Sequence, residues 1–144
     1  MHPYPHVYTV SAAAQATGEV TLRSPGIADL PSMPPPEFDG PGGYWSPETL
    51  LAAAVADCFM LSFRAVARAS QFDWTDLSAD VEAVLERVDG VTRFTRLTTR
   101  ARLTVPAGTD AARARTLLEK AEKVCLITNS LNSERHLETE MVTG

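Results

Sequence analysis

The chain has 144 residues, 44% of them hydrophobic, which suffices for one well-filled core but not two, so we predict a single domain spanning residues 1–144. Its net charge is −5, and its 13 Lys and Arg residues are scattered rather than gathered in a run, which argues against nucleic acid as a partner. The N-terminus lacks the basic-then-apolar order of a signal sequence and Asp57 interrupts the main apolar run, so we expect a cytoplasmic protein without a membrane partner.

The N-terminal third predicts two extended segments followed by a loop. Residues 7–13 and 19–24 have strand-like composition, and Thr17 and Gly18 form the turn between them. The stretch from Pro31 to Gly43 contains five prolines and three glycines, which argue against regular structure. We therefore predict an irregular loop there, at the mouth of a pocket.

A long apolar helix follows, from Pro47 to Ala69. Ser46 can cap the free N–H groups of the first turn, Pro47 has no N–H to leave unpaired, and Glu48 places a negative charge at the positive end of the helix. These three residues together predict a sharp helix start.

The C-terminal half predicts a hairpin, a second helix and a last strand. Residues 77–88 fit helical spacing as well as a strand, and the Asp89-Gly90 pair that follows favours the strand of a hairpin. Residues 97–105 alternate apolar and polar side chains with period two, which predicts the partner strand with one buried face. A helix over 111–131, capped by Thr109 or Asp110, and a strand over 136–142 complete the prediction.

Two cysteines, Cys58 and Cys125, lie on the apolar stripes of the two predicted helices, and nothing else in the chain offers comparable chemistry. Two cysteines 67 positions apart are not the framework of a disulfide-rich secreted domain, so we expect thiols in a reducing compartment. Free cysteine is also a common core residue, so each can be a small core hydrophobe. If the helices pack through these stripes, however, the thiols can come within the distance that a disulfide needs, which the sequence permits without requiring.

Two segments resemble the OsmC/Ohr family of osmotically induced and organic hydroperoxide resistance proteins. SPETLLAAAVADCF, residues 46–59 after Gly42-Gly43, is similar to the family's first cysteine helix, with ten positions from Glu48 to Cys58. KVCLITNSL, residues 123–131, is similar to its second cysteine motif, and the order of elements agrees along the whole chain. The resemblance implies an α+β fold, in which antiparallel sheets wrap around central helices in the order βββ-α-ββ-α-β, and an intertwined homodimer.

The same resemblance implies a thiol-dependent peroxidase of oxidative stress defence that reduces organic hydroperoxides without a cofactor. Cys58 would be the peroxidatic cysteine and Cys125 the resolving one, and a dithiol, such as the dihydrolipoyl group of a lipoylated protein, would reduce the resulting disulfide. Trp45, Phe59 and Phe63 would line an apolar substrate site. Ordinary core packing is the alternative role for these aromatic residues.

Glu48 is the third catalytic candidate that the family pattern implies. Ten residues of continuous helix correspond to about 15 Å, so Glu48 would meet Cys58 only across a dimer interface. Its alternative role is to stabilise the helix dipole. The family's arginine from the early hairpin is missing, because residues 14–17 are uncharged and Gln15 is the nearest match. Arg23 is the closest substitute in sequence for the cation that lowers a thiol pKa, and the other arginines considered are Arg64 and Arg68.

Two other functional classes stay open. The chain can be a non-catalytic dimer that binds a small hydrophobic ligand and keeps its cysteines as core residues. It can also be a metal protein, because His2 and His6 have helix-like spacing and His136 lies near the end. Pro3 and Pro5 make a helix between the first two histidines unfavourable, which favours a frayed terminus and no metal.

Overall fold

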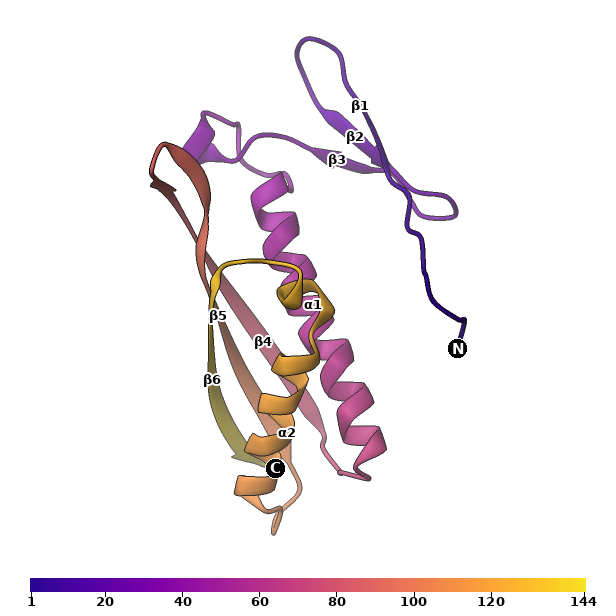
Figure 1. Cartoon of the computed structure of the whole chain (residues 1–144), viewed down its shortest axis with the longest axis vertical. Helices are drawn as coiled ribbons and strands as arrows, with labels where there is room; N and C mark the ends of the chain where they lie inside the picture. The colour runs from indigo at the N-terminus through magenta and orange to yellow at the C-terminus, as the bar shows by residue number, and fades with distance from the viewer. The chain divides into compact units, whose positions relative to one another are not determined.

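The computed structural model describes residues 1–144, which divide into two compact units, Met1–Leu50 and Leu51–Gly144. The single domain stays a prediction. The order of strands and helices is the expected βββ-α-ββ-α-β with two short helical segments added (Figure 1). The elements are β1 (Ser11–Ala13), β2 (Val20–Arg23), β3 (Leu30–Ser32), the 3-10 turn η1 (Pro36–Phe38), α1 (Pro47–Ala69), β4 (Asp76–Val88), β5 (Val91–Val105), α2 (Ala111–Val124), α3 (Leu126–Asn129) and β6 (Glu134–Thr143).

The first unit contains a small antiparallel sheet in the order β1-β2-β3. The first two strands lie inside the predicted segments but are shorter. The prediction that residues 31–43 are irregular throughout is wrong, because β3 includes Pro31 and η1 forms one turn at Pro36–Phe38. Proline is tolerated in β3 because this strand is at the edge of the sheet, where one side needs no hydrogen-bond donors.

Main-chain hydrogen bonds close the proline-rich loop tightly. The N–H groups of Phe38 and Gly40 both donate to the Pro35 carbonyl, at 2.9 and 3.0 Å. Gly40 packs against the chain so closely that a Cβ atom there would lie 1.7 Å from the Pro34 oxygen. The loop therefore requires glycine at position 40 for space.

The start of α1 is confirmed at Pro47, and Ser46 caps it as predicted. The Thr49 N–H donates to Ser46 Oγ at 3.2 Å, and the Ser46 N–H donates to Thr49 Oγ1 at 2.9 Å, which forms a reciprocal cap. α1 is long and apolar enough to span a membrane by length and composition alone, a test that core helices of soluble proteins also pass.

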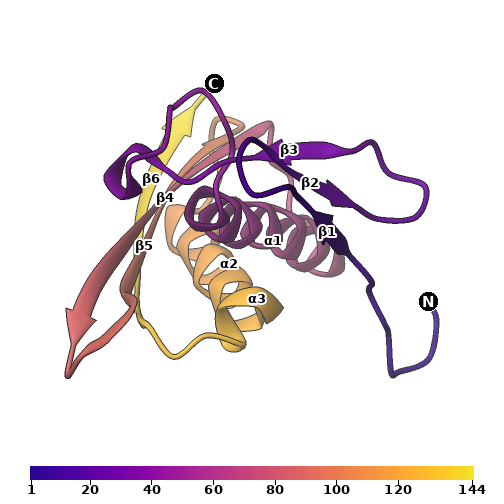
Figure 2. The same cartoon turned by 90° about the horizontal axis from the view of Figure 1, so that it is seen from above.

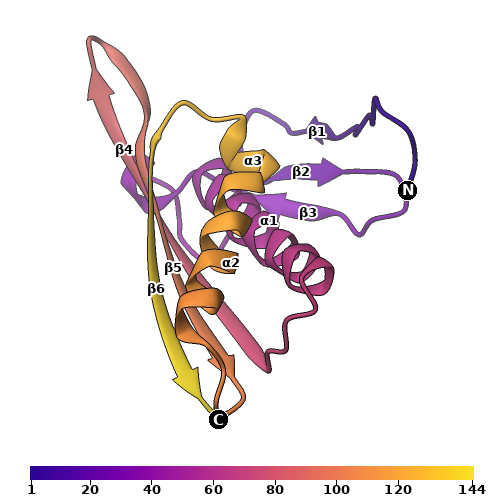
Figure 3. The ribbon, with the colours of Figure 1, turned by 60° about the horizontal axis from the view of Figure 1, so that its bottom comes forward.

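The second unit is built on a sheet in the order β4-β5-β6 (Figure 3). β4 and β5 form the predicted hairpin, and Asp89 and Gly90 at its turn have positive φ angles of 51° and 79°. β6 runs parallel to β5, so this sheet is mixed rather than wholly antiparallel. The parallel pairing follows from the connection, because a strand can return parallel only after a crossover, here made by α2 and α3.

Helices α1 and α2 cover the same face of this sheet (Figure 2). The opposite face carries charged side chains, among which Arg100 pairs with Glu138 at 2.9 Å and with Glu82 at 3.5 Å. The period-two pattern of β5 is confirmed from Thr99 to Leu103, whereas Thr98, predicted on the solvent face, is buried. One cluster of buried core residues joins the sheet and the helices: Phe59, Phe63, Val66, Ala67, Phe72, Leu77, Ala101, Leu103, Val105, Ala114, Leu117, Leu118 and Ala121.

Candidate active site

The two cysteines meet in the second unit, where their side chains lie 3.4 Å apart. Cys58 comes from α1 and is half-buried, with its Sγ 4.0 Å from Ser62 Oγ one turn further along. Cys125 follows the last residue of α2 and is 1% exposed. A disulfide has an S–S distance of about 2.05 Å, so closing the bond requires an approach of only about 1.4 Å.

Cys125 lies at a break between two helices. The predicted continuous helix over 111–131 is wrong, because α2 ends at Val124 and α3 begins at Leu126. Cys125 has φ −63° and ψ 103°, so its backbone is extended between the two helices. The predicted start is confirmed with Asp110 as the cap, since its Oδ1 accepts from the N–H groups of Ala112 and Arg113 at 2.9 and 3.3 Å.

The environment of Cys125 favours its neutral thiol. Burial raises the pKa of Cys125 above its ordinary value, and the neighbouring Cys58 adds to this rise. The hydroxyl of Thr128, 3.1 Å from Cys125 Sγ, and the Thr128 main chain both lower this pKa, but burial outweighs them. At neutral pH Cys125 is therefore a thiol, which suits a resolving cysteine better than the attacking nucleophile.

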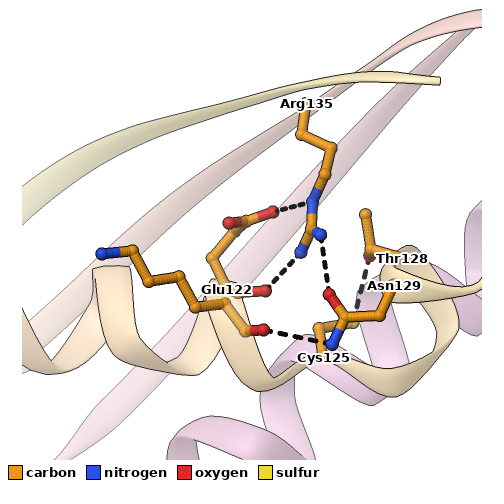
Figure 4. Close-up of polar contacts among 6 residues, drawn as sticks. Glu122, Cys125, Thr128, Asn129 and Arg135 are labelled. Carbon is orange, nitrogen blue, oxygen red and sulfur yellow. Dashed lines mark hydrogen bonds and ion pairs between the residues drawn. The ribbon is translucent and has the colours of Figure 1, made fainter. Parts of the chain in front are cut away.

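An arginine from β6 contacts residues on both sides of the break (Figure 4). Arg135 Nε donates to Glu122 Oε1 at 2.6 Å, and its two terminal nitrogens donate to the Glu122 carbonyl at 2.6 Å and to Asn129 Oδ1 at 2.7 Å. Asn129 Nδ2 in turn donates to the Lys123 carbonyl at 3.1 Å. We call Glu122, Asn129 and Arg135 the Arg135 clamp.

Sequence reasoning missed the Arg135 clamp, although one signal for it exists. Along β6, Arg135, Leu137, Thr139 and Met141 occupy alternate positions on the half-buried face. Arg135 pairs in register with the buried Leu97 of β5. A charged residue at an inward position of a strand indicates a specific polar partner.

The predicted substrate residues fall into different settings. Phe59 and Phe63 are core residues of the second unit, and the Phe63 ring lies edge to face with Trp74 at 5.3 Å between centroids. Trp45 is in the first unit, where it is 48% exposed and its carbonyl accepts from the Met33 N–H at 3.0 Å. Their role in substrate binding stays a prediction.

Glu48 belongs to the first unit, where it lines an apolar pocket. Its Oε2 atom is buried and has no hydrogen-bond partner. The pocket has a volume of about 540 Å³, and its other lining residues are Ala12, Val20, Leu22, Ser32, Met33, Pro34, Pro35, Phe38, Pro47 and Leu50. An unpaired buried carboxylate oxygen is costly for a folded chain.

The arginines considered as activating cations have other positions. Arg23 pairs with Asp29 at 3.0 Å, and both side chains are more than half exposed in the first unit. Arg64 and Arg68 are exposed on α1. For the metal interpretation, His6 Nε2 lies 3.0 Å from the His2 carbonyl, and no three His, Cys, Asp or Glu side chains gather into a metal-binding group.

Comparison with known proteins gives a consistent family assignment. Residues 40–140 match the family model described as OsmC-like protein. YmaD, an uncharacterized protein of Bacillus subtilis, is 29% identical over 115 residues, covering 76% of this chain and 77% of that protein. Peroxiredoxin OsmC of Escherichia coli is 27% identical over 104 residues, covering 72% of this chain and 71% of that protein.

The fold agrees as well. The crystal structure of the organic hydroperoxide resistance protein OsmC from Legionella pneumophila aligns with a TM-score of 0.76 at 25% identity, over 96% of this chain and 98% of that chain. The expected α+β fold is thereby confirmed. Since the family model covers more than half of the sequence, the chain belongs to the OsmC-like protein family.

Proposed function

We propose that this protein is a thiol-dependent peroxidase that reduces organic hydroperoxides, with Cys58 as the peroxidatic cysteine and Cys125 as the resolving one. The observation that carries the proposal is the 3.4 Å approach of the two cysteine side chains. Their environments differ in the direction that these roles need, because Cys58 is half-buried while Cys125 is buried with a raised pKa. The similarity to proteins named peroxiredoxin and organic hydroperoxide resistance protein supports the reaction class.

The proposed reaction has two steps on the enzyme. The Cys58 thiolate attacks the distal oxygen of the hydroperoxide, the O–O bond breaks, and the alkoxide leaves and takes up a proton to become an alcohol. Cys58 then carries a sulfenic acid. Cys125 attacks the sulfenic sulfur, an S–S bond forms, and the S–OH oxygen leaves as water with the Cys125 proton. A dithiol, which we propose to be a dihydrolipoyl group, reduces the disulfide and returns both thiols.

We further propose that the active unit is a cytoplasmic homodimer in which Glu48 of one copy lies near Cys58 of the other. The buried, unpaired Glu48 Oε2 supports a partner from a second copy. Ten residues of continuous helix, about 15 Å, keep Glu48 away from Cys58 of its own chain. A monomer at working concentration by sedimentation would contradict this arrangement.

The apolar sequence of α1 around Cys58 supports an organic substrate. Trp45, Phe59 and Phe63 are the proposed lining, with Trp45 exposed and the two phenylalanines buried in the single chain. An apolar site favours an alkyl or aryl hydroperoxide over hydrogen peroxide, since burying the organic group contributes about 25 cal/mol per Å². Comparing cumene hydroperoxide with hydrogen peroxide as substrates tests this preference.

The deciding experiment treats reduced protein with one equivalent of cumene hydroperoxide and follows intact mass and free thiols. The parent protein should lose the mass of two hydrogens and both thiols. A Cys58→Ser variant should form no internal disulfide. A Cys125→Ser variant should accumulate sulfenic acid that dimedone traps at Cys58. Two untouched thiols in the parent protein would exclude the peroxidase.

A second candidate function is a non-catalytic dimer that binds a small hydrophobic ligand. The apolar pocket of about 540 Å³ in the first unit favours it, as does the uncharged Gln15 at the position of the expected arginine. Untouched thiols together with a ligand retained in a native mass spectrum would support this function over the peroxidase.

A further inference from the structure

We propose that Arg135 is a positioning residue, which holds the turn that carries Cys125 at bonding distance from Cys58. This inference rests on the proposed function, in which Cys58 and Cys125 form a disulfide. It assigns a role in the second step of that chemistry to a residue of β6, outside both cysteine segments.

The first argument is where the guanidinium attaches. The last carbonyls of a helix lack the usual donors of a following turn, and the break after Val124 leaves those of Glu122 and Lys123 near the helix end, where the Glu122 carbonyl still accepts from the Cys125 N–H at 3.3 Å. Arg135 donates to the Glu122 carbonyl, and Asn129 donates to the Lys123 carbonyl. The clamp thus supplies side-chain donors at the break that a continuous helix would not need.

The second argument is that the clamp spans both sides of Cys125. Glu122 precedes the cysteine by three residues, and Asn129 follows it by four. Arg135 contacts both, with three hydrogen bonds between 2.6 and 2.7 Å. A planar guanidinium directs its donors in fixed directions, so these bonds restrict the angle between α2 and α3 in a way that a single contact would not.

The third argument is the setting of Arg135. Its side chain is 28% exposed and that of its partner Glu122 is 20% exposed, whereas both partners of the Arg100–Glu138 pair on the outer face are about half exposed or more. A partly buried pair loses more hydration than a surface pair, so its presence on the covered face indicates a specific structural requirement.

The clamp acts through geometry. The pKa of Cys125 responds to burial, to Thr128 and to Cys58. The clamp keeps the two cysteine side chains close together, so that the S–S bond forms after an approach of only about 1.4 Å. A misplacement of about 1 Å can reduce the rate of such a step by about 100-fold.

The test compares Arg135→Met and Arg135→Lys with Arg100→Met. The control removes the same charge from the outer face of the sheet, where Arg100 contacts only Glu82 and Glu138. Each reduced protein is mixed rapidly with cumene hydroperoxide, quenched with dimedone or acid, and analysed by intact mass. We expect sulfenic acid formation within twofold of the parent in every variant. Disulfide formation should slow at least tenfold in Arg135→Met, less in Arg135→Lys, and not in Arg100→Met.

A second measurement needs no peroxide and therefore separates this inference from the proposed function. Each protein is equilibrated in glutathione redox buffers, and the disulfide equilibrium gives the effective concentration of one thiol relative to the other. Arg135→Met should lower it at least tenfold, with Arg100→Met within twofold of the parent. If the parent protein forms no sulfenic acid, the proposed peroxidase function is wrong, but the disulfide equilibrium still tests the proposed role of Arg135.

The proposed role of Arg135 is overturned if Arg135→Met lowers the melting temperature but leaves the disulfide equilibrium and the rate constant of disulfide formation within twofold of the parent. The same holds if nothing changes. Should Arg135→Met not fold, Asn129→Ala removes one arm of the clamp at an exposed position, and an unchanged equilibrium there overturns the proposal equally.

Discussion

Gly40 offers a direct test of how the proline-rich loop of the first unit is held. In a Gly40→Ala variant the new Cβ would lie 1.7 Å from the Pro34 oxygen, whereas real Cβ contacts essentially never fall below 3.0 Å. The Pro34 main chain must therefore move by at least 1.3 Å, the difference between these distances. The adjoining Pro35 carbonyl would lose its hydrogen bonds from Phe38 and Gly40.

The expected cost follows from these contacts. Two lost main-chain hydrogen bonds contribute about 1 kcal/mol each, and the forced displacement contributes about 1–3 kcal/mol, for a total of about 3–5 kcal/mol. Urea unfolding followed by tryptophan fluorescence in a Trp74→Phe background measures this loss of stability, because the remaining tryptophan, Trp45, lies in the first unit.

Gly43→Ala is the matched control. Gly43 has φ +78° and no atom within 4 Å of the added Cβ, so alanine there meets only backbone strain of about 1–2 kcal/mol. Gly40 is not among the glycines with positive φ, so its alanine variant meets only the lack of space. A Gly40→Ala protein as stable as the parent, or no less stable than Gly43→Ala, would refute this reasoning.

Three further predictions concern Cys125, the cap of α2 and the core. Because burial raises the pKa of Cys125, the rate of disulfide formation should increase as pH rises through neutrality. The reduced protein should also lose stability above about pH 8.5, because the thiol ionises more readily in the unfolded chain than in the folded one. Urea unfolding at several pH values measures this loss of stability, which the Cys125→Ser variant should not show. Asp110→Ala should lower the free energy of unfolding by about 1 kcal/mol, seen as a melting temperature about 3 °C lower by circular dichroism; no change would contradict the cap. Leu118→Ala should cost about 3–5 kcal/mol in urea unfolding because this side chain is fully buried, while Leu126→Ala, 66% exposed, should cost under about 0.5 kcal/mol; equal costs would contradict the packing.

The elements predicted well are those with local signals. Ser46 and Pro47 mark a helix start because capping depends on adjacent residues, and Asp89-Gly90 marks a hairpin because its turn needs two positive φ angles. The family resemblance implied a third strand, but the residue pattern did not locate β3, because an edge strand tolerates Pro31 only through its place in the sheet, which local composition does not encode.

The candidate site was predicted in its cysteines but not in what holds them. Apolar spacing continues through Ala121, Cys125 and Thr128, so periodicity gives no sign of the break between α2 and α3. That break depends on Arg135, which lies beyond a turn on a strand. Helix ends fixed by a distant side chain are tertiary features, and sequence pattern reaches them only through the unusual inward position of the arginine.

The position of the cysteine pair in the chain has a consequence for the oxidised protein. A bond between Cys58 and Cys125 would close a covalent loop of 67 positions that contains β4, β5 and α2. Such a ring restricts the unfolded chain and raises the free energy of unfolding by about 4 kcal/mol. Peroxide would thus convert the protein into a more protease-resistant form, and digestion of cell extracts would report its redox state without an assay of turnover.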